Sequence, residues 1–325
     1  MTKVLLSVPP LVDDSPHAAL LEAAGFEIVA ASWVNRPGED ELMRDLDGIS
    51  ATIAGSEPYT RRVLEAARDL RVIARAGVGF DDVDVEAATD RGIAVTITPG
   101  ANNDTVAEHA LALLLALAKN VVANDRNTRL GSWIRVPTLP LRGATLGIVG
   151  LGRIGRSVAR RATAFDMRIL AYEPDPDPDF IRAYPVELVA FERLLAEADF
   201  VTLHVPLTPQ TRHLIDRRTI ALMKPTAYLV TTARGQLVSE ADLAEALEVG
   251  NLAGAALDVF EMEPPGDSPL RRSGKVLLSP HLAGIDRRSF VDMTSSAAQA
   301  VIALSRGEWP EPQIVNPMVK HRFRW

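Results

Sequence analysis

The chain has 325 residues, 47% hydrophobic and 24% charged, which excludes a disordered, collagen-like or coiled-coil protein and favours two folded domains. It contains no cysteine, which excludes disulfide scaffolds, thiolate zinc sites and cysteine nucleophiles. The net charge of −7 argues against nucleic acid or an anionic membrane as the main partner. Because the longest apolar run, Ala110 to Ala118, is too short for a membrane span, we expect a soluble cytoplasmic protein.

The first part of the chain alternates short β-branched runs with longer helical segments. Strands are expected at Val4–Val8, Phe26–Ala31, Ala51–Ala54, Val72–Arg75 and Ile93–Val95. Helices are expected near Pro16–Ala24, Arg61–Ala67 and Val83–Thr89. This alternation predicts a parallel sheet whose strands are joined by crossover helices.

A long helix and an irregular linker are expected between these elements and the rest of the chain. Asn103–Lys119 predicts a long helix of uniform apolarity, which indicates burial between domains or subunits. The segment from Gly131 to Pro140 then reads as an irregular linker.

The strand and helix pattern restarts after the linker. Strands are expected at Thr145–Val149, Arg168–Tyr172, Phe200–Leu203, Thr226–Thr231, Gly254–Leu257 and Val276–Leu278. Helices are expected at Ile154–Ala164, Phe191–Ala196 and Glu240–Val249, with a last helix ending at Leu304. The acidic run Glu173–Asp179 predicts a rigid loop, and the tail Trp309–Pro317 predicts an extended segment. A second domain, 102–284, is therefore expected to be inserted into a first domain built from 1–101 and 285–325.

The restarted pattern carries a nucleotide-binding signature. Gly150, Gly152 and Gly155 form a G-x-G-x-x-G between an apolar strand and a helix. These glycines permit a tight turn, backbone approach to a pyrophosphate and close helix–strand packing. Glu173 ends the next strand, where an acid binds the adenosine ribose hydroxyls and repels a 2′-phosphate. The pattern predicts NAD rather than NADP, and a Rossmann-type domain.

Polar residues follow several strands of this domain, at the edge where open α/β sheets bind ligands. Arg234 suits a substrate carboxylate, because its planar fork matches that group. His281 suits a general acid, and a neighbouring carboxylate such as Glu263 would hold the ring and favour its protonated form. Taken singly, each of these residues could have no catalytic role: His281 could be a loop histidine, Arg234 a surface cation and Glu263 a solvated acid. No metal site is expected.

Other residues are weaker candidates. His204 ends a strand, where we expect it to line the cofactor site, whereas His109 on the apolar helix reads as a core or interface group. His17, His213 and His321 read as surface positions. In the first domain, Gly77 and Gly79 would expose successive N–H groups as a nest for an anion, or would serve as a plain turn.

Together these residues resemble the NAD-dependent D-2-hydroxyacid dehydrogenase family over nearly the whole chain. The matching stretches are Arg75–Asp84, Asn102–Leu114, Leu146–Gly155, Leu203–Ile215, Thr232–Val238, Ala255–Pro265 and Ser279–Gly284. The resemblance implies two doubly wound α/β domains, with the Rossmann-type NAD domain inserted into a flavodoxin-like substrate domain. It also implies a catalytic cleft between the domains and a homodimer built through the inserted one.

The resemblance assigns residues as well. It implies that Arg234, Glu263 and His281 are catalytic and that substrate binds Val78, Gly79, Arg234 and His281. The cofactor contacts that it implies, beyond the glycines and Glu173, are Thr105, Arg153, Ile154, Val205, Pro206, Thr232, Asp258, His281 and Gly284.

The chain is most similar to short-type D-3-phosphoglycerate dehydrogenases, but it departs from them near the substrate. Such relatives often carry a phosphate-binding Arg where this chain has Ala54 and, three residues on, Glu57, which would repel a phosphate. Arg135 could replace the missing cation in part. Hydroxypyruvate, glyoxylate or a larger 2-keto acid therefore remains an alternative substrate to phosphohydroxypyruvate.

Three rival functions fit less well. An NAD-sensing interaction protein resembling the C-terminal-binding corepressors would not need all three chemical residues. Formate dehydrogenases of this superfamily pair the histidine with Gln where this chain has Glu263. Phosphite-oxidising relatives place a Lys in the glycine loop where this chain has Ala76 or Val78.

Overall fold

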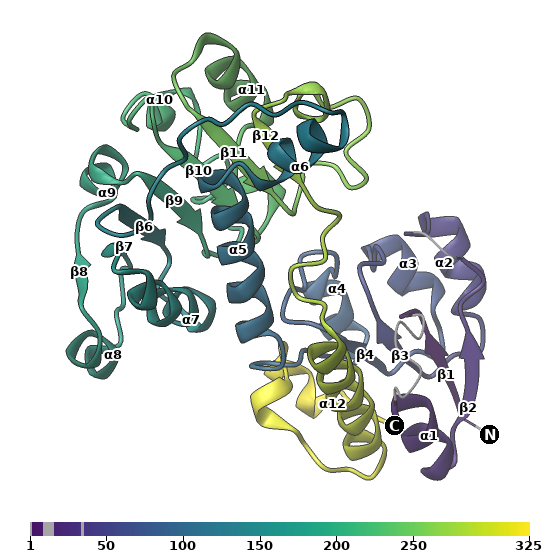
Figure 1. Cartoon of the computed structure of the whole chain (residues 1–325). Helices are drawn as coiled ribbons and strands as arrows, with labels where there is room; N and C mark the ends of the chain where they lie inside the picture. Colours follow the sequence, from purple (N-terminus) through teal and green to yellow (C-terminus); the bar gives the residue numbers. More distant parts are fainter. Residues whose placement is uncertain (1, 9–15, 34–35) are drawn as a thin grey trace. The chain divides into compact units, whose positions relative to one another are not determined.

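The computed structural model describes residues 2–8, 16–33 and 36–325, and it divides the chain into two compact units (Figure 1). Unit 1 comprises Met1–Asn102 and Ile285–Trp325, and unit 2 comprises Asn103–Gly284. The expected domain boundaries differ from these by at most one residue.

Unit 1 contains a five-stranded parallel sheet in the order β2-β1-β3-β4-β5, which is the flavodoxin-like order. Its strands are β1 (Lys3–Leu6), β2 (Glu27–Ala30), β3 (Ala51–Ala54), β4 (Val72–Arg75) and β5 (Ala94–Thr96). Strands β3 and β4 are buried along their whole length, because helices cover both faces of the sheet. Ligand-binding groups in such a sheet therefore come from the loops at the strand ends.

Two layers of helices enclose that sheet. Helices α1 (His17–Ala23) and α12 (Arg287–Ser305) pack against each other and cover one face (Figure 1). Helices α2 (Glu39–Asp45), α3 (Arg61–Ala66) and α4 (Val85–Asp90) cover the other face.

The packing of α1 against α12 corrects one expectation. His17 is not a surface residue: it is only 2% exposed and lies edge-on to the ring of Phe290. Burial lowers the pKa of His17, so the ring stays neutral in this apolar contact. The alternation of the local sequence did not show that α12, from the far end of the chain, would cover this position.

Unit 2 contains a seven-stranded parallel sheet in the order β12-β11-β10-β9-β6-β7-β8. Its strands are β6 (Thr145–Val149), β7 (Arg168–Tyr172), β8 (Val186–Leu188), β9 (Phe200–Leu203), β10 (Tyr228–Thr231), β11 (Gly254–Leu257) and β12 (Val276–Leu278). The chain winds outward from β6 through β8 and then returns to β9 on the other side of β6. Dinucleotides bind at this switch point in Rossmann sheets, and the predicted fold class is confirmed.

Helices cover both faces of this sheet as well. One face packs against α5 (Asn103–Ala118) and α7 (Arg153–Ala162), and the other against α9 (Phe191–Glu197) and α11 (Glu240–Val249). The remaining helices are α6 (Val121–Arg129), α8 (Pro178–Ala183) and α10 (Arg217–Ile220).

Two predicted irregular segments contain regular structure. The acidic run Glu173–Asp179 is not wholly a loop: Asp177 accepts N–H bonds from Asp179 and Phe180 and so starts α8. The tail is not simply extended either, since it forms a short 3-10 turn at Glu311–Gln313. Ile314 then pairs antiparallel with Thr96 beside the sheet of unit 1.

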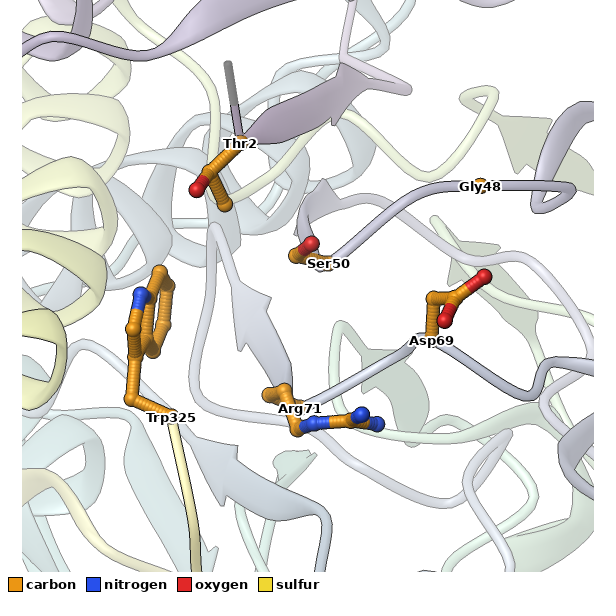
Figure 2. A pocket seen from close by; sticks show the side chains of 6 residues that line it. All are labelled: Thr2, Gly48, Ser50, Asp69, Arg71 and Trp325. Atoms are coloured by element: carbon orange, nitrogen blue, oxygen red, sulfur yellow. The ribbon is translucent and has the colours of Figure 1, made fainter.

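A hollow of about 290 Å³ lies at the amino-terminal ends of the unit 1 strands, the edge opposite to their carboxyl ends (Figure 2). Its lining residues are Thr2, Gly48, Ser50, Asp69, Arg71 and Trp325. The guanidinium of Arg71 already donates to the carbonyls of Arg68 and Leu70. Because ligands of parallel sheets bind at the carboxyl ends of the strands, this hollow is not the candidate site.

Neither a single membrane-spanning helix nor a candidate metal-binding cluster is found within the described ranges. No single helix there is both long and apolar enough to cross a membrane; α5 and α6 reach that length only together, across a 57° bend. The same residues contain no group of three acidic or histidine side chains placed to hold a metal ion.

Candidate active site

The three glycines of the loop between β6 and α7 lie in different surroundings, two crowded and one open. A Cβ on Gly150, which has a φ of +93°, would lie 2.6 Å from the carbonyl oxygen of His204. A Cβ on Gly155 would lie 2.0 Å from the carbonyl oxygen of Gly150. A Cβ on Gly152 would meet nothing within 4 Å. Packing therefore demands two of the glycines, and the third leaves the backbone open to a ligand.

Helix α7 offers that ligand its amino terminus. The helix begins at Arg153, and no side chain of its N-cap residue, Gly152, satisfies the first N–H groups. Those groups have no acceptor within the helix and carry its positive dipole end, which suits a pyrophosphate. The predicted contacts Arg153 and Ile154 are the first two residues of this turn.

Glu173 lies over the same loop. One carboxylate oxygen accepts the N–H of Leu151 at 2.8 Å, and the other accepts the N–H of Asp175 at 3.2 Å. A carboxylate has about four acceptor positions, so both oxygens can still accept ribose hydroxyls. The structure thus places the predicted acid beside the glycines, as a dinucleotide requires.

The ends of β9 and β10 complete this part of the site. The ring of His204 lies 3.0 Å from the hydroxyl of Thr202, and burial lowers its pKa to about 4. The side chain of Val205 packs where Gly150 has no Cβ. Thr232 is 8% exposed, and its hydroxyl has no hydrogen-bond partner among the described residues. An unpaired buried hydroxyl beside an open glycine loop fits a site built for a polar cofactor.

Three other predicted cofactor contacts are placed less directly. Pro206 follows Val205, and its carbonyl accepts the hydroxyl of Thr211. Thr105 lies in the first turn of α5 and is half-buried, and Gly284 is the last residue of unit 2.

The structure brings Glu263 and His281 into contact. The distance between Nδ1 of His281 and Oε2 of Glu263 is 2.6 Å, and the other Glu263 oxygen accepts the N–H of Phe260 at 3.0 Å. The His281 side chain is 46% exposed, so its second ring nitrogen is open to a reacting molecule. This arrangement orients an imidazole as an acid or base.

The charge of Glu263 is stabilised where it lies. Burial alone would raise the pKa of Glu263, but the hydrogen bond and charge of His281, the Phe260 N–H and the charge of Arg234 together lower it. The carboxylate therefore stays ionised beside the imidazole at neutral pH.

Arg234 is held next to this pair by a close backbone approach. Gly235 follows it, and a Cβ there would lie 1.8 Å from the carbonyl carbon of Phe260. The segment that carries Glu263 therefore passes directly beside Arg234. The guanidinium donates to the carbonyl of Ala233 at 2.6 Å and is half-buried.

Asp258 acts as the anchor of the His281 loop. It is fully buried, and its carboxylate oxygens accept hydrogen bonds from the Ser279 hydroxyl at 2.6 Å, from the Leu282 N–H at 3.0 Å and from the Ala283 N–H at 2.8 Å. Its backbone carbonyl accepts the N–H of His281 at 2.7 Å. Sequence analysis named Asp258 only as a cofactor contact and missed Ser279, although Ser279 lies two residues before the catalytic candidate.

Unit 1 has its own polar cluster at the ends of β3 and β4. The guanidinium of Arg75 donates to the carbonyl of Gly79 at 2.9 Å, in the loop that also carries Val78. Glu57 is 4% exposed; one of its oxygens accepts the Gly55 N–H, and the other has no hydrogen-bond partner within the part of the chain that the structure describes. Burial raises the pKa of Glu57, and the nearby charge of Arg75 only partly offsets that rise.

A dinucleotide site joined to a glutamate–histidine pair and an arginine defines the class of NAD-dependent dehydrogenases that act on carboxylate-bearing substrates. The family model described as "D-isomer specific 2-hydroxyacid dehydrogenase, NAD binding domain" matches residues 111–283. A glyoxylate reductase of Korarchaeum cryptofilum is 46% identical over 86% of this chain and 85% of that protein.

Two further relatives extend the comparison. A D-3-phosphoglycerate dehydrogenase of Methanocaldococcus jannaschii is 40% identical over 98% of this chain, which spans only 60% of that longer protein. The structure of a D-lactate dehydrogenase from Aquifex aeolicus, complexed with NAD and lactic acid, matches with a TM-score of 0.85 and 28% identity, covering 97% of this chain and 99% of that one.

The chain belongs to the D-isomer specific 2-hydroxyacid dehydrogenase family, and its cofactor is NAD.

Proposed function

We propose that this protein uses NADH to reduce small, unphosphorylated 2-keto acids of the size of glyoxylate and hydroxypyruvate. In reverse it would oxidise the corresponding D-2-hydroxy acids. The contact between His281 and Glu263, in one site with Arg234, carries the proposal.

Each side chain has a defined task in this proposal. NAD, when bound, supplies or accepts the hydride at the substrate's C2. Arg234 orients the substrate carboxylate through its planar fork. His281 donates a proton to the forming alkoxide from the ring nitrogen that does not face Glu263. Glu263 holds the ring and favours the protonated state that the reduction consumes.

The preference for an unphosphorylated substrate rests on Glu57. This carboxyl is buried beside Arg75, in the cluster that holds the Gly79 carbonyl. A phosphate near it would meet an acid rather than a free cation, and like charges at close range are costly in a buried site. The glyoxylate reductase similarity points the same way.

Phosphohydroxypyruvate is the second candidate, because a D-3-phosphoglycerate dehydrogenase covers nearly the whole chain at 40% identity. Arg135, which sequence analysis offered as a replacement phosphate ligand, is exposed in the segment after α6.

One assay separates these functions. The oxidation of NADH is followed with glyoxylate, hydroxypyruvate, phosphohydroxypyruvate, pyruvate and branched 2-keto acids, and the configuration of the product is determined. We expect the highest kcat/KM with glyoxylate or hydroxypyruvate and a D product. A preference for phosphohydroxypyruvate would support the second candidate. No oxidation with any of these acids would favour the corepressor-like, NAD-sensing protein.

The same proposal includes a cytoplasmic homodimer that does not act on nucleic acid or membranes. Support for the dimer comes from apolar side chains exposed on α6 and the segment after it: Val121, Val122, Leu130, Trp133, Ile134 and Val136. Trp133 is 79% exposed, and exposed large apolar side chains gathered along one segment of the chain are typical of an interface. Light scattering tests the dimer: replacing Trp133 and Ile134 by Ser should shift the protein toward monomer.

A further inference from the structure

The loop that carries His281 has a strained backbone that must be held in place. His281 adopts a φ of +51°, a left-handed conformation that is costly for a residue with a side chain. Such a conformation persists only where surrounding contacts fix it. Asp258 provides those contacts, through its carbonyl to His281 and through its carboxylate to Leu282 and Ala283.

Asp258 is itself tied to helix α5 through Ser279. Its Oδ1 lies 2.6 Å from Ser279 Oγ, which in turn lies 3.1 Å from Nε2 of His109. The distance between Nε2 of His109 and Oδ1 of Asp258 is 3.6 Å. His109 lies in α5, Asp258 directly follows the buried strand β11, and Ser279 directly follows β12, so these side chains tie the loop to three elements of unit 2.

The direction of these hydrogen bonds follows from the number of protons. Asp258 already accepts two backbone N–H groups, and as a carboxylate it can only accept. Ser279 has one hydroxyl proton, which therefore points to Asp258. His109 must then donate its Nε2–H to the Ser279 oxygen. The ring of His109 carries a proton on Nε2 whether it is neutral or charged.

His109 is a polar residue on a largely apolar helix. The neighbours that α5 buries are apolar, among them Val106, Ala107 and Ala110, and the His109 side chain is 21% exposed. Sequence analysis assigned it to the core or to an interface. Its ring nitrogen instead begins a chain of donors that ends on the Asp258 carboxylate, which also accepts N–H groups of the His281 loop.

We propose that His109 is a positioning residue for the acid His281, acting through Ser279 and Asp258. This inference rests on the proposed function, because it assigns His109 to the same proton transfer. Removing the donor leaves Ser279 free to rotate and Asp258 with one support fewer. The imidazole of His281 should then spend less time in the reactive orientation, with little change in how the substrate carboxylate is bound.

The kinetic test uses full-length His109→Leu, His109→Gln and Ser279→Ala proteins, with NADH and glyoxylate. His321→Leu, the same change at an exposed histidine, is the matched control. His109→Leu should lower kcat about tenfold, the effect expected from one hydrogen bond, with KM changed by less than about threefold. Because the Gln amide can also donate to Ser279, His109→Gln should recover most of that loss.

Two results would overturn the proposal. The first is a wild-type kcat in His109→Leu, or equal damage from Leu and Gln. The second is full loss from His109→Leu in a Ser279→Ala background, since removing Ser279 should already break the chain.

A second readout does not depend on turnover. In the ¹⁵N spectrum of histidine-labelled protein, His109 should be protonated on Nε2, and this signal should move in Ser279→Ala. An Nδ1–H tautomer would overturn the inference. If wild-type protein fails to oxidise NADH with any 2-keto acid while the Nε2–H is found, the proposed function fails and the hydrogen-bond chain stands.

Discussion

Two glutamates, one in each unit, show opposite electrostatics at the ends of parallel sheets. Glu263 in unit 2 is half-buried and paired with His281 and the Phe260 N–H, and its pKa is lowered. Glu57 in unit 1 is buried, has one oxygen without a hydrogen-bond partner among the described residues, and has a raised pKa. Burial acts on both, and the partners decide the sign.

The two carboxyl groups are therefore suited to different roles. The carboxylate of Glu263 already has its hydrogen bonds, so it can hold a proton donor steady without any ligand. Glu57 has none for one of its oxygens, so its cluster tolerates another negative charge poorly. We therefore expect the cluster around Glu263 to control the rate of proton transfer.

The largest effect should come from His281 itself. His281→Asn removes the proton donor, and kcat for 2-keto acid reduction should fall by roughly 10²- to 10⁴-fold, a typical general-acid contribution. Single-turnover oxidation of NADH measures this loss without product release. His321→Asn is the control for the same change on the surface. Turnover at the wild-type rate would remove His281 from the mechanism.

The next effect concerns the pair. In Glu263→Gln the ring loses the charged acceptor that holds its Nδ1 at 2.6 Å. A hydrogen bond to a charged group contributes about 1.5–3 kcal/mol, so kcat for 2-keto acid reduction should fall by roughly 10- to 100-fold. Single-turnover oxidation of NADH measures this loss. A wild-type rate would mean that the pair does not govern the proton transfer.

His204 tests burial with no charged partner to oppose it. Its pKa is lowered to about 4, so between pH 6.5 and pH 4 the unfolded chain binds a proton that the folded chain does not. The free energy of unfolding should therefore fall as the pH falls through this window, by about 3 kcal/mol in all. The loss should be smaller in His204→Gln, measured by urea unfolding at each pH. Equal slopes in both proteins would contradict the lowered pKa.

The smallest effect should be at Glu57. Because its folded pKa is raised, the folded chain binds more protons than the unfolded chain above pH 4.5, and stability falls as pH rises through that window. Glu57→Gln removes this penalty and should raise the free energy of unfolding at pH 8 in urea unfolding, with the gain vanishing near pH 4, where the carboxyl is protonated in both states. A loss of stability at pH 8 would show instead that Glu57 is ionised and paired with Arg75.

Local patterns predicted much of this molecule. The glycine loop, Glu173 and the alternation of strands and helices depend on residues close in sequence, so spacing alone could place them. Glu263 and His281 could be proposed as partners because both follow strands that end at one sheet edge. Their contact is the part that the resemblance and the topology made predictable.

Contacts between distant segments were not predictable in this way. His109 meets Ser279 across 170 residues, and α12 covers His17 from the far end of the chain. Helices α2, α6, α8 and α10 and strand β8 were also missed, because all are short and the helices show no apolar stripe.

The central claim is that His281 and Glu263 act as one proton-donating unit. A double-mutant cycle measures it most directly, with single-turnover NADH oxidation by the wild type, His281→Asn, Glu263→Gln and the double variant. Since Glu263 acts only through the ring, the double variant should be no slower than His281→Asn alone. Rate losses that multiply would show that the two residues act separately, and would contradict the account.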